Sequence, residues 1–252
     1  MGAIAMPAPP LTVKGMCGDT GPALRLSDAF VAEADLAAPV RRWLMGQPGV
    51  ASVGEEIDAG SGVADLVAGV DALLARPRAA FGDALATWVL GRAEQGVSEE
   101  DLRGWAPYGW RSLQRRTVAP LLAEGLLSRS LIDGVVTYRA MVDTSDPYGG
   151  LVAVELKLSA WRRAIAQAGR YRLFAEQCFV ALPDSRVASA VIGEAARNRV
   201  GVLAVENDGS VRVVHTVAPA AAVQPHRRRW AAEQVLRSVT TPGARRAGSP
   251  IV

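Results

Sequence analysis

In the stretch Leu151–Leu158 a large apolar residue stands at every second position, and Ala153, Glu155 and Lys157 stand between them. Successive side chains of a β-strand point to opposite faces of the sheet, so this alternation predicts a strand. One face would carry Val152, Val154, Leu156 and Leu158. The opposite face would carry Glu155 and Lys157, which places a carboxylate beside an ammonium group near the end of the strand. A solvated face of an antiparallel strand is the alternative explanation for such a pair.

An acidic residue also interrupts an apolar strand earlier in the chain. Residues 53–57 and 63–70 have strand character and are separated by the glycine-rich turn 58–62, which predicts a β-hairpin. Asp65 lies within the second of these strands. An acid in such a position is costly unless a partner or a cation satisfies its charge.

The remaining elements mix helices and strands. Apolar residues recur at helical spacing over residues 27–45, with Ser27 as a plausible N-cap and Glu33 and Asp35 near the start. Downstream of the Glu155 strand we expect helices at 159–177 and 185–197 and strands at 178–182, 200–205 and 211–217. This succession predicts an α/β (α+β) fold.

Residues 77–140 follow a different pattern. Three short helices precede two strands joined by Asp133-Gly134, a dipeptide typical of two-residue hairpin turns. That layout is the one expected of a winged helix-turn-helix. The third helix presents Ser112, Gln114, Arg115 and Arg116. In a winged helix this element commonly enters the DNA major groove, where Arg and Gln can contact base edges; contact with another protein is the alternative.

A further pair of polar residues completes the pattern. Gln167 and Tyr171 stand four residues apart on the helix after Glu155, so they share one helix face. An acid on a helix, an acid on a hairpin strand, Glu-x-Lys on a strand and Gln-x-x-x-Tyr on a helix together resemble the PD-(D/E)XK nuclease superfamily, in particular its RecB-like and resolvase-like branches. The resemblance implies a restriction-endonuclease-like fold, with a mixed central sheet flanked by helices.

The resemblance also implies a role for each matching residue. Asp65 and Glu155 would hold Mg²⁺ or Mn²⁺, and Lys157 would orient the attacking water or offset charge at phosphorus. Glu33, rather than Asp35, would be the acid of the first helix. Gln167 and Tyr171 would position the site or the DNA backbone, although packing explains them equally well. The chain departs from the family in having Ala64 where proline is usual, and a long insertion between Asp65 and Glu155.

These patterns divide the chain into four parts. Residues 1–24 would be a flexible segment, and residues 25–76 with 143–217 would form the discontinuous nuclease-like core. Residues 77–142 would be the inserted winged helix, and residues 218–252 a basic C-terminal helix and tail. Four arginines flank the Gln167 helix and could contact phosphates, although a solvated helix face explains them nearly as well: Arg162, Arg163, Arg170 and Arg172.

Composition narrows the function classes. Cys17 and Cys178 are the only cysteines and form no metal-binding or disulfide pattern, which favours a reduced cytoplasmic setting. We expect no signal peptide and no membrane span. The net charge is +3, and almost all the positive charge is arginine, so Lys157 stands out. His215 and His226 are isolated and are given no role.

The expected function is metal-dependent hydrolysis of DNA by a cytoplasmic or nucleoid-associated enzyme, with DNA held by the inserted module. Many enzymes of this fold act as homodimers, and RNA remains open as a substrate. Two other functions compete with this one: a DNA-binding regulator that uses the nuclease fold as a scaffold, and an interaction protein whose winged helix recruits a partner.

Overall fold

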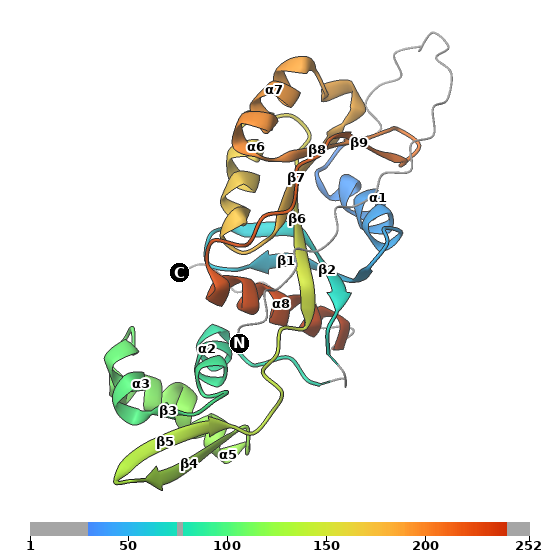
Figure 1. The fold of residues 1–252 in the computed structure, drawn as a ribbon. Helices are drawn as coiled ribbons and strands as arrows, with labels where there is room; N and C mark the ends of the chain where they lie inside the picture. Colours follow the sequence, from blue (N-terminus) through green and yellow to red (C-terminus); the bar gives the residue numbers. More distant parts are fainter. Residues whose placement is uncertain (1–29, 75–77, 241–252) are drawn as a thin grey trace. The chain divides into compact units, whose positions relative to one another are not determined.

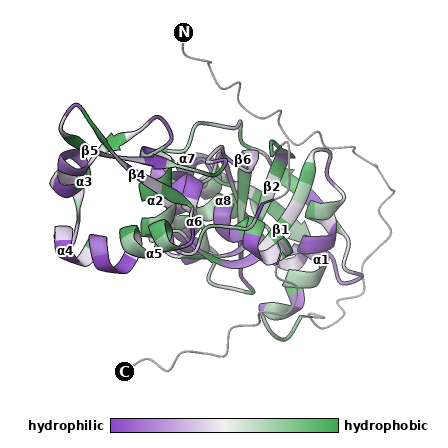
Figure 2. Ribbon diagram, turned by 90° about the horizontal axis from the view of Figure 1, so that it is seen from below, coloured by the Kyte–Doolittle hydropathy of each residue, from purple (hydrophilic) through white to green (hydrophobic). Residues whose placement is uncertain are grey.

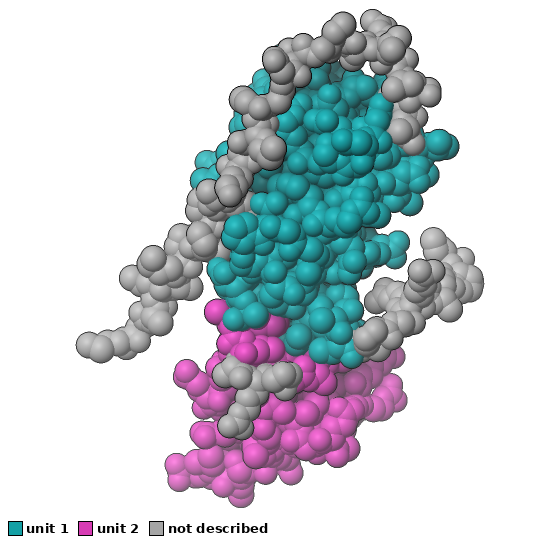
Figure 3. All heavy atoms as spheres, turned by 90° about the vertical axis from the view of Figure 1, so that its right-hand side faces the viewer, with its two compact units in different colours: residues 1–72, 148–252 teal, residues 73–147 magenta. Residues whose placement is uncertain are grey.

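The computed structural model describes residues 30–74 and 78–240 of the chain. The chain forms two compact units, residues 1–72 with 148–252 and residues 73–147, shown in teal and magenta in Figure 3. The module expected at residues 77–142 lies within the second unit. The expected flexible segment 1–24 and the N-cap Ser27 lie outside the described residues.

The first unit is built on a six-stranded sheet with the order β1-β2-β6-β7-β8-β9 (Figure 1). Strands β1, β2 and β6 are antiparallel to one another, β6, β7 and β8 are parallel, and β9 is antiparallel to β8. The prediction of a mixed sheet is therefore confirmed. The strands are β1 (Val50–Asp58), β2 (Val63–Ala72), β6 (Tyr148–Leu156), β7 (Gln177–Pro183), β8 (Gly201–Val205) and β9 (Val211–His215).

Helices cover both faces of this sheet. One face packs against α1 (Ala34–Met45), and the other packs against α6 (Trp161–Arg170), α7 (Ser189–Asn198) and α8 (Pro225–Thr240). Short 3-10 turns at Tyr171–Leu173 and Asp184–Arg186 complete the unit. Figure 2 shows hydrophobic colouring along β2 and mixed colouring on α1, as expected for a buried strand and a helix with one solvated face. Within the described ranges no helix combines the length and apolarity needed to cross a bilayer.

Both faces of β6 are buried. Val152 and Val154 join the core cluster on the α1 side, while Leu151 and Ala153 join the cluster beneath α6 and α8. The predicted alternation is confirmed, but the face that carries Glu155 is not solvated, because two helices cover it. Burying a valine or leucine side chain contributes roughly 1.5–3 kcal/mol, so two apolar faces fix this strand in the centre of the sheet.

The parallel strands are joined by helical crossovers. Parallel neighbours cannot be linked by a tight turn, so α6 connects β6 to β7 and α7 connects β7 to β8. Strands β7 and β8 also pack closely at Gly201, where an added Cβ would overlap the Phe179 ring. The consequence for the site is that residues at the carboxyl end of β6 stand next to the start of α6.

The C-terminal helix corrects the sequence-based division of the chain. Residues 218–252 were expected to form a basic C-terminal helix and tail apart from the core; the helix is present, but α8 is part of the first unit. Ala231, Ala232 and Val235 are fully buried in the cluster shared with α6. The apolar stripe of α8 is short and lies among arginines in the sequence. It has an apolar surface to pack against only when the sheet has formed, because that surface is one face of the sheet.

The second unit contains helices followed by a small sheet. Its sheet has the strand order β3-β5-β4, and a separate apolar core includes Leu90, Leu102, Leu121 and Tyr138. Asp133 and Gly134 both have positive φ values, 50° and 78°, as a two-residue type I′ turn requires. The elements are α2 (Ala84–Arg92), β3 (Val97–Ser98), α3 (Glu99–Trp105), α4 (Trp110–Leu113), α5 (Ala119–Ala123), β4 (Leu127–Ile132) and β5 (Val135–Ala140).

A π-helical segment joins α4 to α5. Over Gln114–Val118 the helix widens, and the N–H of Ala119 donates to the carbonyl of Gln114, five residues back. Pro120 supplies a physical reason, because a proline inside a helix has no N–H and its ring clashes with the carbonyl four residues earlier. The predicted helix at 112–124 is therefore present as one continuous but widened helical stretch.

Candidate active site

Asp65 and Glu155 lie opposite each other on neighbouring antiparallel strands. The ladder between β2 and β6 pairs Leu66 with Val154, and one further step in the same register brings Asp65 opposite Glu155. Residues directly opposite in such a pair share a sheet face, with Cβ atoms about 4.5–5.5 Å apart. The backbone N–H of Leu156 donates to Oδ2 of Asp65 at 2.6 Å, which ties the aspartate to β6. The two acids are therefore held side by side.

Glu155 is buried with its charge only partly compensated. Its side chain is 2% exposed, and Oε2 accepts a hydrogen bond of 2.5 Å from the Tyr171 hydroxyl. Burial, with a smaller contribution from the charge of Asp65, raises the pKa of Glu155 from 4.5 to about 7. The pKa of Asp65 is raised as well, again chiefly by burial. A pair of crowded, poorly solvated carboxylates is an arrangement that a cation stabilises.

Lys157 stands between two acids. Its Nζ lies 2.8 Å from Oε2 of Glu33 and 4.0 Å from Oε1 of Glu155, and its side chain is 22% exposed. The hydrogen bond that Lys157 donates to Glu33 is the main reason that the pKa of Lys157 is raised. The ammonium group is thus charged and held at the end of β6, with Glu33 at the N-cap position of α1 as its direct partner.

Gln167 and Tyr171 form the wall of the site on the α6 side. The side-chain amide of Gln167 donates to the Tyr171 hydroxyl at 3.0 Å and to the carbonyl of Val63 at 3.5 Å. The Tyr171 hydroxyl in turn lies 2.6 Å from that carbonyl, and its ring is fully buried. The expected i,i+4 pair is therefore a direct contact, and it joins α6 to the start of β2 and to Glu155.

The Tyr171 hydroxyl has one proton and faces two acceptors, the Val63 carbonyl and Glu155. If Glu155 is protonated, it can donate to this hydroxyl while the hydroxyl donates to Val63. If Glu155 is ionised, it competes for the tyrosine's proton. The geometry therefore couples the position of this hydrogen to the charge of Glu155, and the pKa of Tyr171 is raised by burial and by Glu155.

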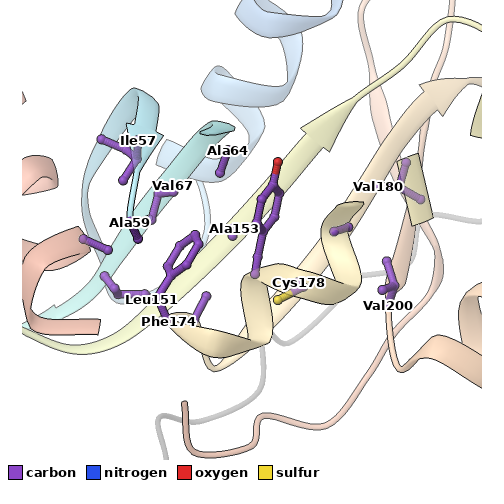
Figure 4. Close-up of a cluster of buried hydrophobic side chains, with 14 of the residues drawn as sticks. Ile57, Ala59, Ala64, Val67, Leu151, Ala153, Phe174, Cys178, Val180 and Val200 are labelled. Carbon is purple, nitrogen blue, oxygen red and sulfur yellow. The ribbon is translucent and has the colours of Figure 1, made fainter. Parts of the chain in front are cut away.

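Apolar side chains lie behind the polar groups. Figure 4 shows Ala64, Ala153, Phe174 and Cys178 among the buried residues of the cluster beneath α6. Few dipoles are available in such surroundings to solvate a carboxylate, which is why burial is the largest cause of the raised pKa of Glu155.

Several of the expected residues lie elsewhere. Asp35 accepts hydrogen bonds from the backbone N–H groups of Val31 and Ala32, both at 2.8 Å, so it holds the backbone just before α1. Arg162 and Arg163 are exposed on α6, and the Arg162 guanidinium lies 4.2 Å from the centroid of the Trp161 ring. Both point to the solvated side of that helix rather than joining the carboxylate pair.

The expected DNA-contacting residues belong to the second unit. Gln114, Arg115 and Arg116 are exposed and lie on the π-helical segment. Ser112 is half-buried on α4. Leu113 and Val118 of the same stretch are buried in that unit's core, so the polar side faces solvent.

Two features near the site were missed from the sequence. Glu56 lies on β1 opposite Asp65, has φ of 52°, and contributes to the raised pKa of Asp65. Arg228 of α8 forms a partly buried ion pair of 2.5 Å with Glu176, whose other oxygen accepts from the N–H of Leu151 at 2.6 Å. The sequence carried a signal for Glu56, because it is an acid within a predicted strand. The ion pair of Arg228 with Glu176 becomes visible only when α8 is packed against the sheet.

The donor set for a metal ion consists of two carboxylates. Among the described residues, no group of three or more His, Cys, Asp and Glu side chains is arranged to hold a metal ion. Mg²⁺ in proteins is often held by only one or two carboxylates, with water and substrate phosphate completing the shell. Asp65 and Glu155 fit that pattern.

The chain was also compared with known proteins. No protein-family model, curated protein or solved structure matches it.

Proposed function

We propose that this protein is a metal-dependent nuclease of the PD-(D/E)XK type that acts on DNA in the cytoplasm or at the nucleoid. The observation that carries the proposal is the meeting of Asp65, Glu155 and Lys157 at the end of two paired strands, although the first two are far apart in the sequence. If Asp65 pointed to the other face of the sheet, it could not share a metal ion with Glu155, and the proposal would have no physical basis.

The topology of the first unit supports the same proposal. Proteins of the PD-(D/E)XK superfamily have the order helix, three-stranded meander, helix, strand. Here α1 is followed by the antiparallel strands β1, β2 and β6, the crossover helix α6 and the strand β7. In that correspondence Glu33 would be the acid of the first helix, Asp65 that of the second strand and Glu155 that of the third.

The chemistry follows from the residues at the site. A bound Mg²⁺ or Mn²⁺ would polarise the scissile phosphodiester and lower the pKa of a bound water. Asp65 and Glu155 would supply the oxygens that hold it. Lys157 can offset negative charge that develops on the phosphate or orient the attacking water. Tyr171 is a positioning residue, because it acts by holding Glu155.

Glu33 would set the position of Lys157. It accepts the 2.8 Å hydrogen bond from the ammonium group, while the glutamate side chain itself is 47% exposed. An exposed carboxylate can exchange such a bond when a substrate phosphate arrives. Gln167 would keep the Tyr171 hydroxyl in place.

The second unit would act as a winged helix-turn-helix that binds DNA. Its order of helices and strands, with β3 pairing at the edge of the β4–β5 hairpin, is the order expected of that module. The exposed side chains of Gln114, Arg115 and Arg116 have the chemistry to contact bases and phosphates in a groove. Ser112 could add a phosphate contact.

The decisive experiment is cleavage of labelled single- and double-stranded DNA, and of RNA, by the full chain with Mg²⁺, Mn²⁺ or EDTA. We expect metal-dependent cutting that Lys157→Ala lowers by ~10²–10³-fold, the usual effect of losing one charge-stabilising group. Arg197→Ala is the matched control, because Arg197 is exposed on α7 and pairs only with Glu194 among the described residues. Metal-independent cutting, or cutting unaffected by Lys157→Ala, would refute the assignment.

A DNA-binding regulator is the second candidate. It is favoured by the limited donor set and by the engagement of Lys157 with Glu33. Retention of DNA without cutting under every metal condition would support it. Failure to bind nucleic acid would instead point to protein recruitment, for which Leu131, 71% exposed near the tip of the β4–β5 hairpin, is a suitable contact.

A further inference from the structure

The turn between β1 and β2 contains two glycines. The ladder between the two strands ends at the pair Asp58 and Val63, so residues 59–62 lie outside it. Gly60 and Gly62 have φ values of 77° and 119°, which side-chain-bearing residues rarely adopt. The turn therefore depends on glycine at both positions and presents main chain rather than side chains.

Two arginines from different helices lie against this turn. Nη1 of Arg227 donates to the carbonyl of Ala59 at 3.3 Å and would lie 3.2 Å from a Cβ at Gly60. Nη2 of Arg170 would lie 3.9 Å from a Cβ at Gly62. Arg170 is exposed and has no ion-pair partner in residues 30–74 and 78–240. A side chain at either glycine would occupy the space in front of these guanidinium groups.

The neighbouring carboxylate does not neutralise the arginines. Asp58 uses one of its oxygens to accept the backbone N–H of Gly60 at 2.8 Å, which shapes the turn. The backbone of Asp58 is fixed by Gln234, which donates to its carbonyl at 2.6 Å and accepts from its N–H at 3.3 Å. Two guanidinium groups against one carboxylate leave the turn with a local positive charge.

A buried hydroxyl lies in the same turn. The Oγ atom of Ser61 is shielded from solvent and has no hydrogen-bond partner within the described part of the chain. Leaving such a group unpaired costs free energy, and rotation about the Cα–Cβ bond of Ser61 would turn its hydroxyl toward a phosphate held at the turn. A phosphate oxygen is a suitable acceptor for a serine hydroxyl, and arginine is the preferred cation for phosphate.

The turn is connected directly to the candidate active site. It leads into Val63, whose carbonyl is bonded to Tyr171 and Gln167, and Asp65 follows two residues later. A group bound at the turn would therefore lie close to the carboxylates, on the side where α6 and α8 begin to cover the sheet.

We propose that residues 59–62, together with Arg170 and Arg227, bind a phosphate of the nucleic-acid backbone next to the one that is cut. The identity of the ligand rests on the proposed nuclease function, but the site itself is defined by its own residues. The phosphate would take hydrogen bonds from both guanidinium groups and from Ser61, and the bare glycines would allow it to approach the backbone.

The test measures DNA binding rather than cleavage. The full chain and its Arg170→Gln/Arg227→Gln variant are titrated with a labelled duplex in EDTA, between ~50 and ~200 mM salt. Each phosphate contact contributes about 0.9 to the slope of log K against log salt, so we expect the variant's slope to be smaller by about 1. Arg197→Gln, which removes the same type of charge from α7, should keep the wild-type slope.

Two further arms identify the phosphate and control for folding. Methylphosphonate substitution at single positions should weaken wild-type binding at one internal position and leave the double variant unaffected there. If wild-type binding is instead weakened by removing the 5′-terminal phosphate, the site binds the end of a strand. Ser61→Ala should weaken binding and raise Tm by about 2–4 °C, because it removes an unpaired buried hydroxyl.

The outcomes separate this proposal from the nuclease assignment. A smaller slope in a protein that cuts no DNA would support the phosphate site and refute the nuclease. A wild-type slope in the double variant of a protein that does cut would refute the phosphate site alone. A wild-type chain that binds no duplex overturns the phosphate site.

Discussion

The hydroxyl of Tyr171 lies 2.5 Å from Oε2 of Glu155, and the two residues come from different layers of the first unit. Tyr171 is in the turn that ends α6, and Glu155 is on the central strand β6. Through this contact, the packing of a helix sets the position and the charge of a carboxylate in the candidate active site.

Tyr171→Phe should raise the pKa of Glu155 further, because the tyrosine hydrogen bond lowers that pKa. If ionised Glu155 is the active form, the acidic limb of the cleavage pH profile moves to higher pH, and cleavage near neutral pH falls. The variant should also lose roughly 1–3 kcal/mol of stability, because the Val63 carbonyl and Gln167 lose a partner.

Tyr148→Phe is the control for this prediction. Tyr148 is also buried, and its hydroxyl accepts a 2.7 Å hydrogen bond from Ser52. It should lose comparable stability in urea titrations while keeping the wild-type pH profile. Equal profiles for Tyr171→Phe and wild type would show that the tyrosine only fills space.

The metal-free protein should lose stability as pH rises from about 4.5 to about 7. Glu155 has a folded-state pKa of about 7 against 4.5 when unfolded, so the folded state favours the protonated form. Its contribution is complete below 4.5 and is lost as pH passes through the folded-state pKa. A shift of this size corresponds to roughly 3 kcal/mol. Urea titrations across this range measure it.

Glu155→Gln should flatten this pH dependence, since the amide does not ionise. Glu194→Gln should leave it unchanged, because the pKa of Glu194 is lowered by Arg197 and Asn198 rather than raised. Added Mg²⁺ should stabilise the wild type most at the upper end of the range. A stability profile of Glu155→Gln that matches the wild type would assign the pH dependence to another group.

Arg228→Met should destabilise the first unit by up to about 3 kcal/mol, because it leaves the partly buried carboxylate of Glu176 without its ion-pair partner. Arg197→Met, which breaks an exposed pair, should cost less than ~1 kcal/mol. Urea unfolding monitored by far-UV circular dichroism compares the two. Equal costs would show that α8 is attached only loosely to the sheet.

Substituting Gln for both Arg115 and Arg116 should weaken DNA binding and lower its salt slope by about 1 for each lost phosphate contact. The stability of the chain should be unchanged, since both side chains are exposed. The matched control is Arg42→Gln together with Arg197→Gln, which removes two exposed charges from the first unit. An unchanged slope in the Arg115 and Arg116 variant would argue that the helix does not contact DNA.

The sequence by itself determined most of the elements and the residue types at the site. Alternation identified β6, glycine marked the β1–β2 turn, and Asp133-Gly134 marked the hairpin of the second unit, because these signals depend on local backbone geometry. Glu155 and Lys157 fell on one face for the same reason.

Only the tertiary structure decided what those residues contact. The register of β2 against β6 put Asp65 opposite Glu155, and the packing of α6 placed Tyr171 on the glutamate. The role of α8 was hidden because its apolar stripe has a partner only once the sheet exists. Long-range contacts depend on which surfaces are left to bury, and a local sequence pattern carries no information about that choice.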